Sequence, residues 1–172
     1  MAGLRKGKCY TTVKRAYTRK SKLQRKSYVK AAPSVRIIRF DMGDPKKQYD
    51  YEVILKSKQA IQLRHNSLES ARMVVNRALH TSLGLDYYFK IRVFPHHVLR
   101  ENKMIVGAGA DRMQKGMQMA FGRPVGLAAQ VKRNQPVFSV QIHKNNLEIA
   151  KRALKKAPPR LAGKFIIEVK KI

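Results

Sequence analysis

Short apolar runs along the chain predict a set of strands, because their length and spacing suit half-buried strand positions. From position 87 to position 93, apolar side chains alternate with Tyr88, Lys90 and Arg92. This period of two places one face of a strand in a core. Further apolar runs predict strands at 35–40, 51–55 and 60–63, and a turn at 42–45 ends the first of them.

A helical spacing of apolar residues follows the strand at 60–63. One apolar stripe is formed by Leu68, Ala71, Val74, Val75, Ala78 and Leu79. Asn66 stands three residues before Glu69, the spacing of a capping box in which each residue bonds a backbone N–H of the other. Gly84 is placed to end the helix, because glycine accepts the left-handed backbone that often follows the last turn.

The C-terminal part of the chain repeats this plan. Residues 140–150 align without gaps with residues 61–71, and five of the eleven aligned pairs are identical. Each unit predicts a strand, an asparagine cap, a helix and, after a loop, a second strand, at 87–93 or at 164–169. A true duplication and two independent capped units would look alike, so both origins stay open. Both predict an α+β fold with two helices packed on one face of a mainly antiparallel sheet.

The segment between the two units, residues 101–126, differs in composition. It holds five of the ten glycines and four of the seven methionines. Residues 107–110 carry no side chain larger than alanine, so packing cannot anchor them. Asp111 and Gln114 have capping-box spacing, and a helical face follows, formed by Met113, Met117, Ala120 and Phe121. We therefore expect a flexible loop that leads into a short helix.

Charge is distributed unevenly along the chain. There are 38 Lys and Arg against 10 Asp and Glu, a formal net charge of +28, and 13 basic residues precede the first carboxylate, Asp41. Like charges at this density repel one another, so a polyanionic partner is expected to neutralise them. Residues 1–34 hold too few apolar side chains to fold alone and are expected to order only on that partner. We therefore predict a basic arm at 1–34 and a single globular α+β domain at 35–172, with the flexible loop at 103–116.

The arm combines two chemistries that bind RNA. Each Lys or Arg that neutralises a phosphate releases condensed counterions, and tyrosine rings offer flat faces to unstacked bases. The residues expected to bind RNA are Arg5, Lys6, Lys8, Tyr10, Lys14, Arg15, Tyr17, Arg19, Lys20, Lys22, Arg25 and Lys26.

Catalytic and metal-binding patterns are scarce. Arg112 stands where a dinucleotide-binding loop needs glycine, and Cys9 lies in the arm without a fixed histidine partner. His96 and His97 are adjacent, so on a strand they would point to opposite faces and would not chelate one ion. The sequence predicts a binding protein without catalytic residues, metal or cofactor. A free RNA chaperone or an RNA-modifying enzyme is the alternative.

The same sequence argues against a membrane protein. The longest stretch without Asp, Glu, Lys or Arg is ten residues, 134–143, about half of what a membrane-spanning helix needs. The arm also lacks the apolar face of an interfacial helix. A single cysteine forms no intramolecular disulfide, so a cytoplasmic, reducing compartment is expected. A mitochondrial transit peptide, which is also basic and poor in acids, is the competing interpretation of the arm.

Three stretches in and after the glycine-rich loop, 102–104, 107–117 and 120–124, carry a family resemblance. They resemble the signature of the large-subunit ribosomal protein ten, e-type, of archaea and eukaryotes, the counterpart of bacterial protein sixteen. Shorter matches lie at 8–10, 17–20, 40–43 and 91–98, whereas the segment 20–33 departs from the usual pattern. The chain ends at Ile172 without the longer tail of eukaryotic members, so an archaeal protein is expected.

The resemblance implies an α/β-hammerhead-type sandwich in the cytoplasmic ribosome, with the basic arm on large-subunit ribosomal RNA near the central protuberance. It also implies that the loop approaches the acceptor end and elbow of transfer RNA near the peptidyl-transferase centre. Neighbouring ribosomal proteins and assembly factors are the other implied partners. The loop residues expected to face transfer RNA are Lys103, Gly107, Gly109, Arg112 and Lys115. The alternative is a loop that only packs on ribosomal RNA.

Overall fold

The structure is a computed structural model that describes residues 4–18, 23, 25, 29, 32–105 and 107–172. These residues form two antiparallel sheets, one with the strand order β1-β4-β7-β2-β8 and a small sheet with the order β3-β6-β5. The strands are β1 (Asp41–Gly43), β2 (Tyr51–Ser57), β3 (Ile61–Arg64), β4 (Tyr88–Ile91), β5 (His97–Glu101), β6 (Arg123–Val131), β7 (Pro136–Ile142) and β8 (Phe165–Lys171). The α-helices are α1 (His65–Leu83), α2 (Ala110–Met113) and α3 (Leu147–Leu154), and 3-10 turns occur at η1 (Gly7–Tyr10), η3 (Lys144–Asn146) and η4 (Pro158–Arg160).

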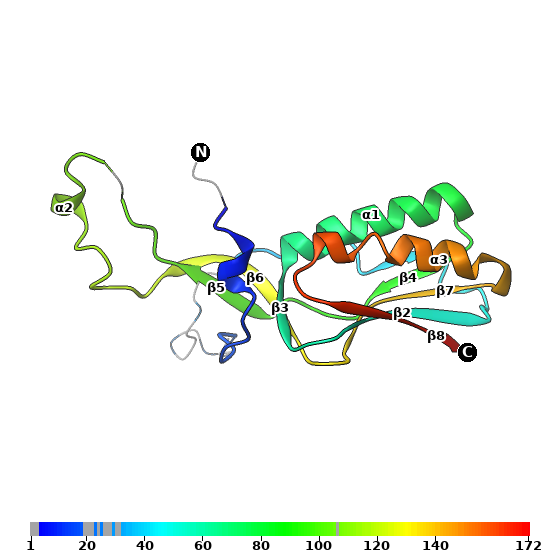
Figure 1. The fold of residues 1–172 in the computed structure, drawn as a ribbon. Coiled ribbons are helices and arrows are strands. Elements are labelled where there is room, and N and C mark those ends of the chain that lie inside the picture. The colour runs from blue at the N-terminus through cyan, green and yellow to red at the C-terminus, as the bar shows by residue number, and fades with distance from the viewer. Residues whose placement is uncertain (1–3, 19–22, 24, 26–28, 30–31, 106) are drawn as a thin grey trace.

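Helices α1 and α3 cover one face of the five-stranded sheet (Figure 1). Phe89 of β4 and Phe138 of β7 are fully buried beneath them and meet edge to face, with ring centroids 5.4 Å apart. Leu79 of α1 and Leu154 of α3 complete this core. The predicted α+β architecture, with two helices on one face of an antiparallel sheet, is confirmed.

The apolar stripe predicted for the first helix faces this core. Its fully buried members are Leu68, Ala71, Val75 and Leu79. The helix ends at Leu83, and Gly84 follows with a φ of 59° and donates its backbone N–H to the carbonyl oxygen of His80. The predicted end of the helix is therefore confirmed.

The capping box predicted at Asn66 and Glu69 is wrong. Helix α1 begins at His65, and no side chain among the described residues caps it. Glu69 instead accepts two hydrogen bonds from the Arg72 side chain, at 2.6 and 2.8 Å. These bonds hold the pKa of the buried Glu69 carboxyl below its usual value. A carboxylate held by a cation one turn onward cannot also fold back to the start of the helix.

The second predicted cap fails in the same way. Helix α3 begins at Leu147, and among the described residues no side chain caps it. Glu148, expected as the capping carboxylate, accepts a hydrogen bond from Lys151 at 2.7 Å. In both helices the carboxylate bonds to a neighbouring cation and not to the backbone N–H groups, because a donor of opposite charge adds Coulomb attraction to the hydrogen bond.

The strand predicted at 35–40 is also wrong, since the first strand, β1, begins at Asp41. The backbone N–H of Arg36 donates to His65 Nδ1 at 3.2 Å, and that of Ile38 donates to Glu69 Oε2 at 3.4 Å. These donors bond to side chains of α1, so the segment lies against the start of that helix and not within a sheet.

The two similar sequence units occupy different places in the fold. β3, the first strand of one unit, is an edge strand of the small sheet, whereas the corresponding β7 is the central strand of the larger sheet. The small sheet itself was not predicted. It extends away from α1 and α3 toward the glycine-rich loop (Figure 1). Of the helices that the structure describes, none combines the length and the apolar character needed to cross a membrane.

Candidate nucleic-acid interface

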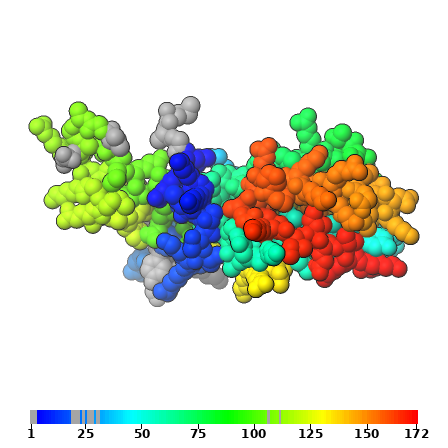
Figure 2. Space-filling view, viewed as in Figure 1, coloured from blue at the N-terminus to red at the C-terminus, as the bar shows by residue number. Residues whose placement is uncertain are grey.

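Residues 4–18 of the arm cross the small sheet from one edge strand to the other (Figure 1). The carbonyl oxygens of Thr11, Lys14 and Tyr17 accept hydrogen bonds from β3, β6 and β5 in turn. The donors are the backbone N–H of Gln62, the side chain of Gln130 and the backbone N–H of Val98, at 3.0, 2.8 and 3.0 Å. Figure 2 shows the described arm on the surface between the loop and the helices.

Two glutamines on the small sheet supply hydrogen bonds that the arm backbone needs. Gln62 is only 4% exposed. Its side-chain amide donates to the carbonyl oxygen of Tyr10 at 2.8 Å, and its side-chain oxygen accepts a bond from Gln130 at 3.1 Å. A buried amide is stable only when its polar atoms are bonded. Without the arm, the buried Gln62 amide would lose a hydrogen-bond partner. Without the two glutamines, the carbonyl oxygens of Tyr10 and Lys14 in the arm would lose their donors.

These bonds differ from the expectation that the arm orders only on its partner. Residues 4–18 already lie on the sheet through backbone hydrogen bonds. Composition gives the number of apolar side chains in the arm, but it contains no information on hydrogen bonds between the arm backbone and a distant strand. The division between arm and domain at position 34 stays a prediction.

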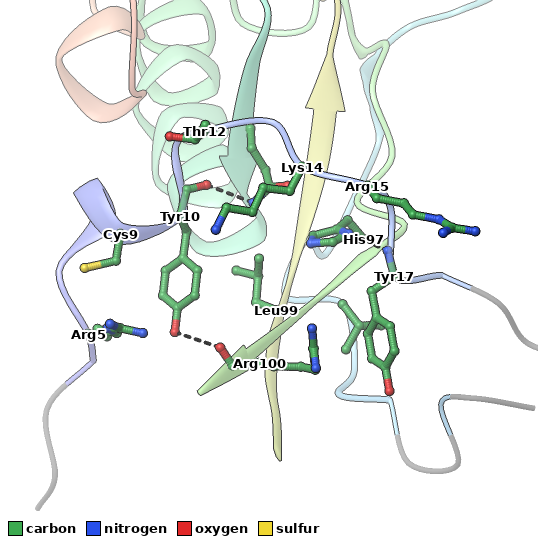
Figure 3. Close-up of a pocket in the computed structure, with 12 residues that line it drawn as sticks. Arg5, Cys9, Tyr10, Thr12, Lys14, Arg15, Tyr17, His97, Leu99 and Arg100 are labelled. Carbon is green, nitrogen blue, oxygen red and sulfur yellow. Dashed lines mark hydrogen bonds between the residues drawn. The ribbon is translucent and has the colours of Figure 1, made fainter. Parts of the chain in front are cut away.

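A pocket of about 230 Å³ lies between the arm and β5, and we call it the arm pocket (Figure 3). Its lining includes four cationic side chains, those of Arg5, Lys14, Arg15 and Arg100. None of the described residues that line it is a carboxylate. An excess of one charge around a concave surface raises the local concentration of the opposite charge. The pocket therefore favours an anion.

Guanidinium groups and aromatic rings pack together beside the arm pocket. The Arg100 guanidinium lies 4.6 Å from the ring centroid of Tyr17 and 4.0 Å from that of Phe121. The two rings meet edge to face, with centroids 6.2 Å apart. Because Tyr17 belongs to the arm and Phe121 to the end of the glycine-rich loop, Arg100 connects the two segments.

His97 of β5 holds the arm through its imidazole ring. Its Nδ1 accepts the backbone N–H of Tyr17 at 2.8 Å, which requires a neutral ring with the proton on Nε2. Burial lowers the pKa of His97, and the charge of Arg100 lowers it further. The neighbouring His96 is exposed. Among the described residues, no group of three or more His, Cys, Asp or Glu could hold a metal ion.

The residues that the sequence predicts to bind RNA fall into three groups. The described cations of the arm are exposed, namely Arg5, Lys6, Lys8, Lys14, Arg15 and Arg25. Tyr10 and Tyr17 are half-buried, each with a guanidinium near its ring. The remaining predictions, Arg19, Lys20, Lys22 and Lys26, lie outside the described residues.

The glycine-rich loop projects from the end of the small sheet, between β5 and β6 (Figure 1). The residues expected to face transfer RNA are all exposed, namely Lys103, Gly107, Gly109, Arg112 and Lys115. Gly107 and Gly109 have φ values of 150° and 79°, and no described atom lies within 4 Å of an added Cβ. Glycine is therefore needed here for the backbone conformation and not for lack of space.

The helix predicted after this loop is mostly absent. Helix α2 covers only Ala110–Met113, and Gly116, with a φ of 56°, lies in the turn that follows. The side chains expected on one helical face are exposed, namely Met113, Met117, Ala120 and Phe121. An apolar spacing stabilises a helix only when the stripe packs on another layer, and this segment projects beyond both sheets.

The base of the loop is held more firmly than its middle. The Gln114 side chain accepts the backbone N–H of Ile105 at 2.7 Å and donates to the carbonyl oxygen of Lys103 at 3.2 Å. A Cβ at Gly122 would lie 2.6 Å from the backbone of Glu101, so only glycine permits this approach. The loop therefore has a fixed base and an exposed tip.

Sequence reasoning missed the residues of the small sheet that organise this surface, namely Gln62, Arg100 and Gln130. No local motif marks them, because each works through a segment distant along the chain. The available signal was an uncharged amide between two apolar neighbours, at Gln62 between Ile61 and Leu63 and again at Gln130 between Ala129 and Val131. Such an amide on a buried strand indicates a backbone partner from elsewhere.

Comparison with known proteins adds independent information. Over residues 13–168 the chain matches the family described as "Ribosomal protein L16p/L10e". The "Large ribosomal subunit protein uL16" of Hyperthermus butylicus is 44% identical over 155 residues, which cover 90% of this chain and 86% of that protein. Proteins of the same name from Staphylothermus marinus and Metallosphaera sedula are 44% and 43% identical over 160 and 162 residues. Each match covers 92% of this chain, and 88% and 89% of the respective relative.

Proposed function

The chain belongs to the ribosomal protein L16p/L10e family and is a structural protein of the large ribosomal subunit, and from this premise we propose which of its surfaces bind RNA. In this proposal the arm and the small sheet bind ribosomal RNA, and the glycine-rich loop faces transfer RNA. The resemblance to the e-type protein ten is confirmed, and the relatives are archaeal, as expected. The chain is a cytoplasmic ribosomal protein and not an enzyme, so the alternative of an RNA-modifying enzyme is wrong.

The absence of carboxylates from the described lining of the arm pocket carries the ribosomal RNA part of the proposal. The exposed Lys6 and Lys8 extend the cationic surface beyond the pocket. A phosphate backbone that follows the arm would meet these charges in succession and release counterions at each. The RNA in this proposal is large-subunit RNA near the central protuberance, as the family resemblance implies.

The loop supports the transfer RNA part of the proposal. The tip, residues 107–110, carries only glycine and alanine, so its backbone can approach RNA closely. Lys103, Arg112 and Lys115 are exposed around it and supply the charges that a phosphate needs. The fixed base and exposed tip suit a segment that reaches from ribosomal RNA toward the acceptor end and elbow of a bound transfer RNA.

Other macromolecules complete the set of partners. A large-subunit protein has neighbouring ribosomal proteins beside it as well as ribosomal RNA. Assembly factors belong to the proposal as further partners. Exposed apolar side chains of the loop, such as Met113 at 79% and Met119 at 86% exposure, offer surface for such contacts.

The salt dependence of RNA binding tests the ribosomal RNA contact. The double variant Lys14→Gln/Arg15→Gln removes two arm-pocket cations and should reduce the slope of log K against log salt by roughly 1.4 to 1.8, or about 0.7 to 0.9 for each lost phosphate contact. The matched control is Lys132→Gln/Arg133→Gln in the exposed turn between β6 and β7, which removes the same charge. Equal slopes in the two double variants would show that net charge, and not this surface, binds ribosomal RNA.

A further inference from the structure

The arm pocket has the size of a site for a small group. Its volume of about 230 Å³ is below the roughly 300 Å³ at which pockets for drug-sized molecules begin. Part of its lining is apolar, since Val98 and Leu99 of β5 are 2% and 4% exposed. The cationic side chains of the lining come from the arm and from the end of β5 (Figure 3). Apolar and cationic lining together match a flat ring joined to an anion.

Tyr10 presents a fixed aromatic ring to this pocket. Its hydroxyl donates to the carbonyl oxygen of Arg100 at 3.4 Å, as Figure 3 shows, and its backbone carbonyl is bonded to Gln62. Both ends of the residue are therefore attached to the small sheet. A ring that is already oriented loses little further freedom when a planar ligand stacks on it.

Arg5 lies on the ring of Tyr10 with its guanidinium carbon 5.7 Å from the ring centroid. Arg5 is exposed, so its side chain has room to move and admit a base between the guanidinium and the ring. Stacking between an aromatic ring and an arginine is a common way to hold an unpaired base.

The cationic side chains near the ring favour a base that carries a phosphate. Lys14 is an exposed lining residue of the same pocket, and Figure 3 shows its side chain beside Tyr10, where it can meet a phosphate carried by the stacked nucleotide. A base inside a duplex cannot enter, because its faces are covered by its neighbours. The pocket therefore distinguishes a single strand from a duplex of the same charge.

We propose that the arm pocket holds one unstacked nucleotide of the bound RNA, with its base against Tyr10 and its phosphate near Lys14. The inference rests on the proposed function, which requires RNA at this surface. It goes further by assigning a site for a single nucleotide and the aromatic ring on which its base stacks. The occupant is a nucleotide within an RNA strand and not a free nucleotide.

The test compares Tyr10→Phe with Tyr10→Leu in the full chain, because both variants lose the hydroxyl and only one keeps the ring. The probes are a single-stranded RNA of twelve nucleotides, a twelve-base-pair RNA duplex and free AMP. The expected result is strand binding near wild type for Tyr10→Phe and roughly 5- to 150-fold weaker for Tyr10→Leu, the range found for one stacked base. Duplex binding should be the same in both variants. Tyr51→Ala, at the start of β2 and away from the arm, is the control and should bind both RNAs as wild type does.

Several results would overturn the inference. One is equal strand binding by the Phe and Leu variants when circular dichroism shows both to be folded, since the ring would then be dispensable. Another is equal weakening for strand and duplex, because that pattern indicates a general loss of the arm. Binding of AMP as tightly as of the strand would assign the pocket to free nucleotides. The proposed function itself fails differently, through the absence of binding to both RNAs by the wild-type chain.

Discussion

Two glycines with left-handed backbones allow the cost of backbone strain to be measured apart from the cost of a steric clash. Gly43 has a φ of 85°, and a Cβ there would lie 1.9 Å from the carbonyl oxygen of Tyr87. Gly84 has a φ of 59°, and no described atom lies within 4 Å of its added Cβ. Both positions carry the conformational penalty of an L-residue, whereas only Gly43 also carries a clash with the backbone of the neighbouring strand.

We predict that Gly43→Ala lowers the free energy of unfolding by about 3 kcal/mol, combining about 1–2 for the left-handed backbone with about 1–3 for overpacking. Gly84→Ala should lower it by about 1 kcal/mol. Urea denaturation of both variants measures the difference. Losses of equal size would show that β1 and β4 move apart freely at this contact, contrary to the structure.

We expect the pH dependence of stability to come from two histidines, the buried His65 and the half-buried His97. His65 Nδ1 accepts the backbone N–H of Arg36, and His97 Nδ1 accepts that of Tyr17. Burial lowers the pKa of both rings, with nearby arginines adding to the effect. The unfolded chain, in which a histidine has a pKa of about 6.5, therefore binds protons more readily than the folded chain.

Stability should consequently fall as the pH decreases through about 6.5 toward the lower pKa values of the folded protein. Above that window both states are neutral and the histidines contribute no pH dependence. The double variant His65→Gln/His97→Gln should flatten the profile between pH 7 and pH 5, as measured by urea denaturation. His80→Gln, at an exposed position of α1, is the control and should leave the slope unchanged. An unchanged slope in the double variant would assign the effect to other groups.

At the scale of elements, the segments with strong periodicity were predictable from the sequence. The strands at 51–55, 60–63 and 87–93 and the stripe of α1 follow from apolar spacing, and the structure contains β2, β3, β4 and α1 at these places. The capping boxes failed because Glu69 and Glu148 have cations one turn onward. The strand at 35–40 failed because its N–H groups bond to side chains of α1. Such competition depends on hydrogen-bond partners, and the periodic spacing of apolar residues contains no information on them.

The surface that is proposed to face RNA could be predicted only in part. Composition predicts the arm, and the family signature predicts the loop. The attachment of the arm could not be predicted, because it uses Gln62, Gln130 and His97, which are distant in sequence and carry no shared motif. The predicted helix beyond Met113 failed for a related reason, since no layer of the fold covers its apolar side.

The structure of the loop predicts what a deletion at its tip will do. Removing residues 106–110 leaves the Gln114 bonds to Lys103 and Ile105 and the Arg100–Phe121 contact in place. The variant should therefore enter large subunits at the wild-type level, while accommodation of transfer RNA slows several-fold. Subunit occupancy and single-turnover accommodation kinetics are the two measurements. A normal accommodation rate would favour the alternative in which the loop only packs on ribosomal RNA.

At the scale of the molecule, most of the apolar core lies away from the end that is proposed to bind RNA. The main apolar core lies between α1, α3 and the five-stranded sheet, and it also takes in Ile61 and Leu63 of β3 and Ala129 and Val131 of β6. A much smaller cluster joins Val98 and Leu127 of the small sheet to Val29 of the arm. The small sheet thus has little core of its own, and the arm contributes to its stability. Of the 38 Lys and Arg in the chain, 13 precede Asp41, at the end that is proposed to bind RNA.

The single cysteine of the chain offers the most direct test of the central claim, that the arm and the small sheet lie on ribosomal RNA. Cys9 is exposed and lines the arm pocket, so an iron chelate attached to it would generate hydroxyl radicals at this surface. In large subunits that contain the labelled chain, we predict cuts in large-subunit ribosomal RNA, with none when a Cys9→Ser chain is treated in the same way. Incorporation of the labelled chain without cuts in the RNA would contradict the account.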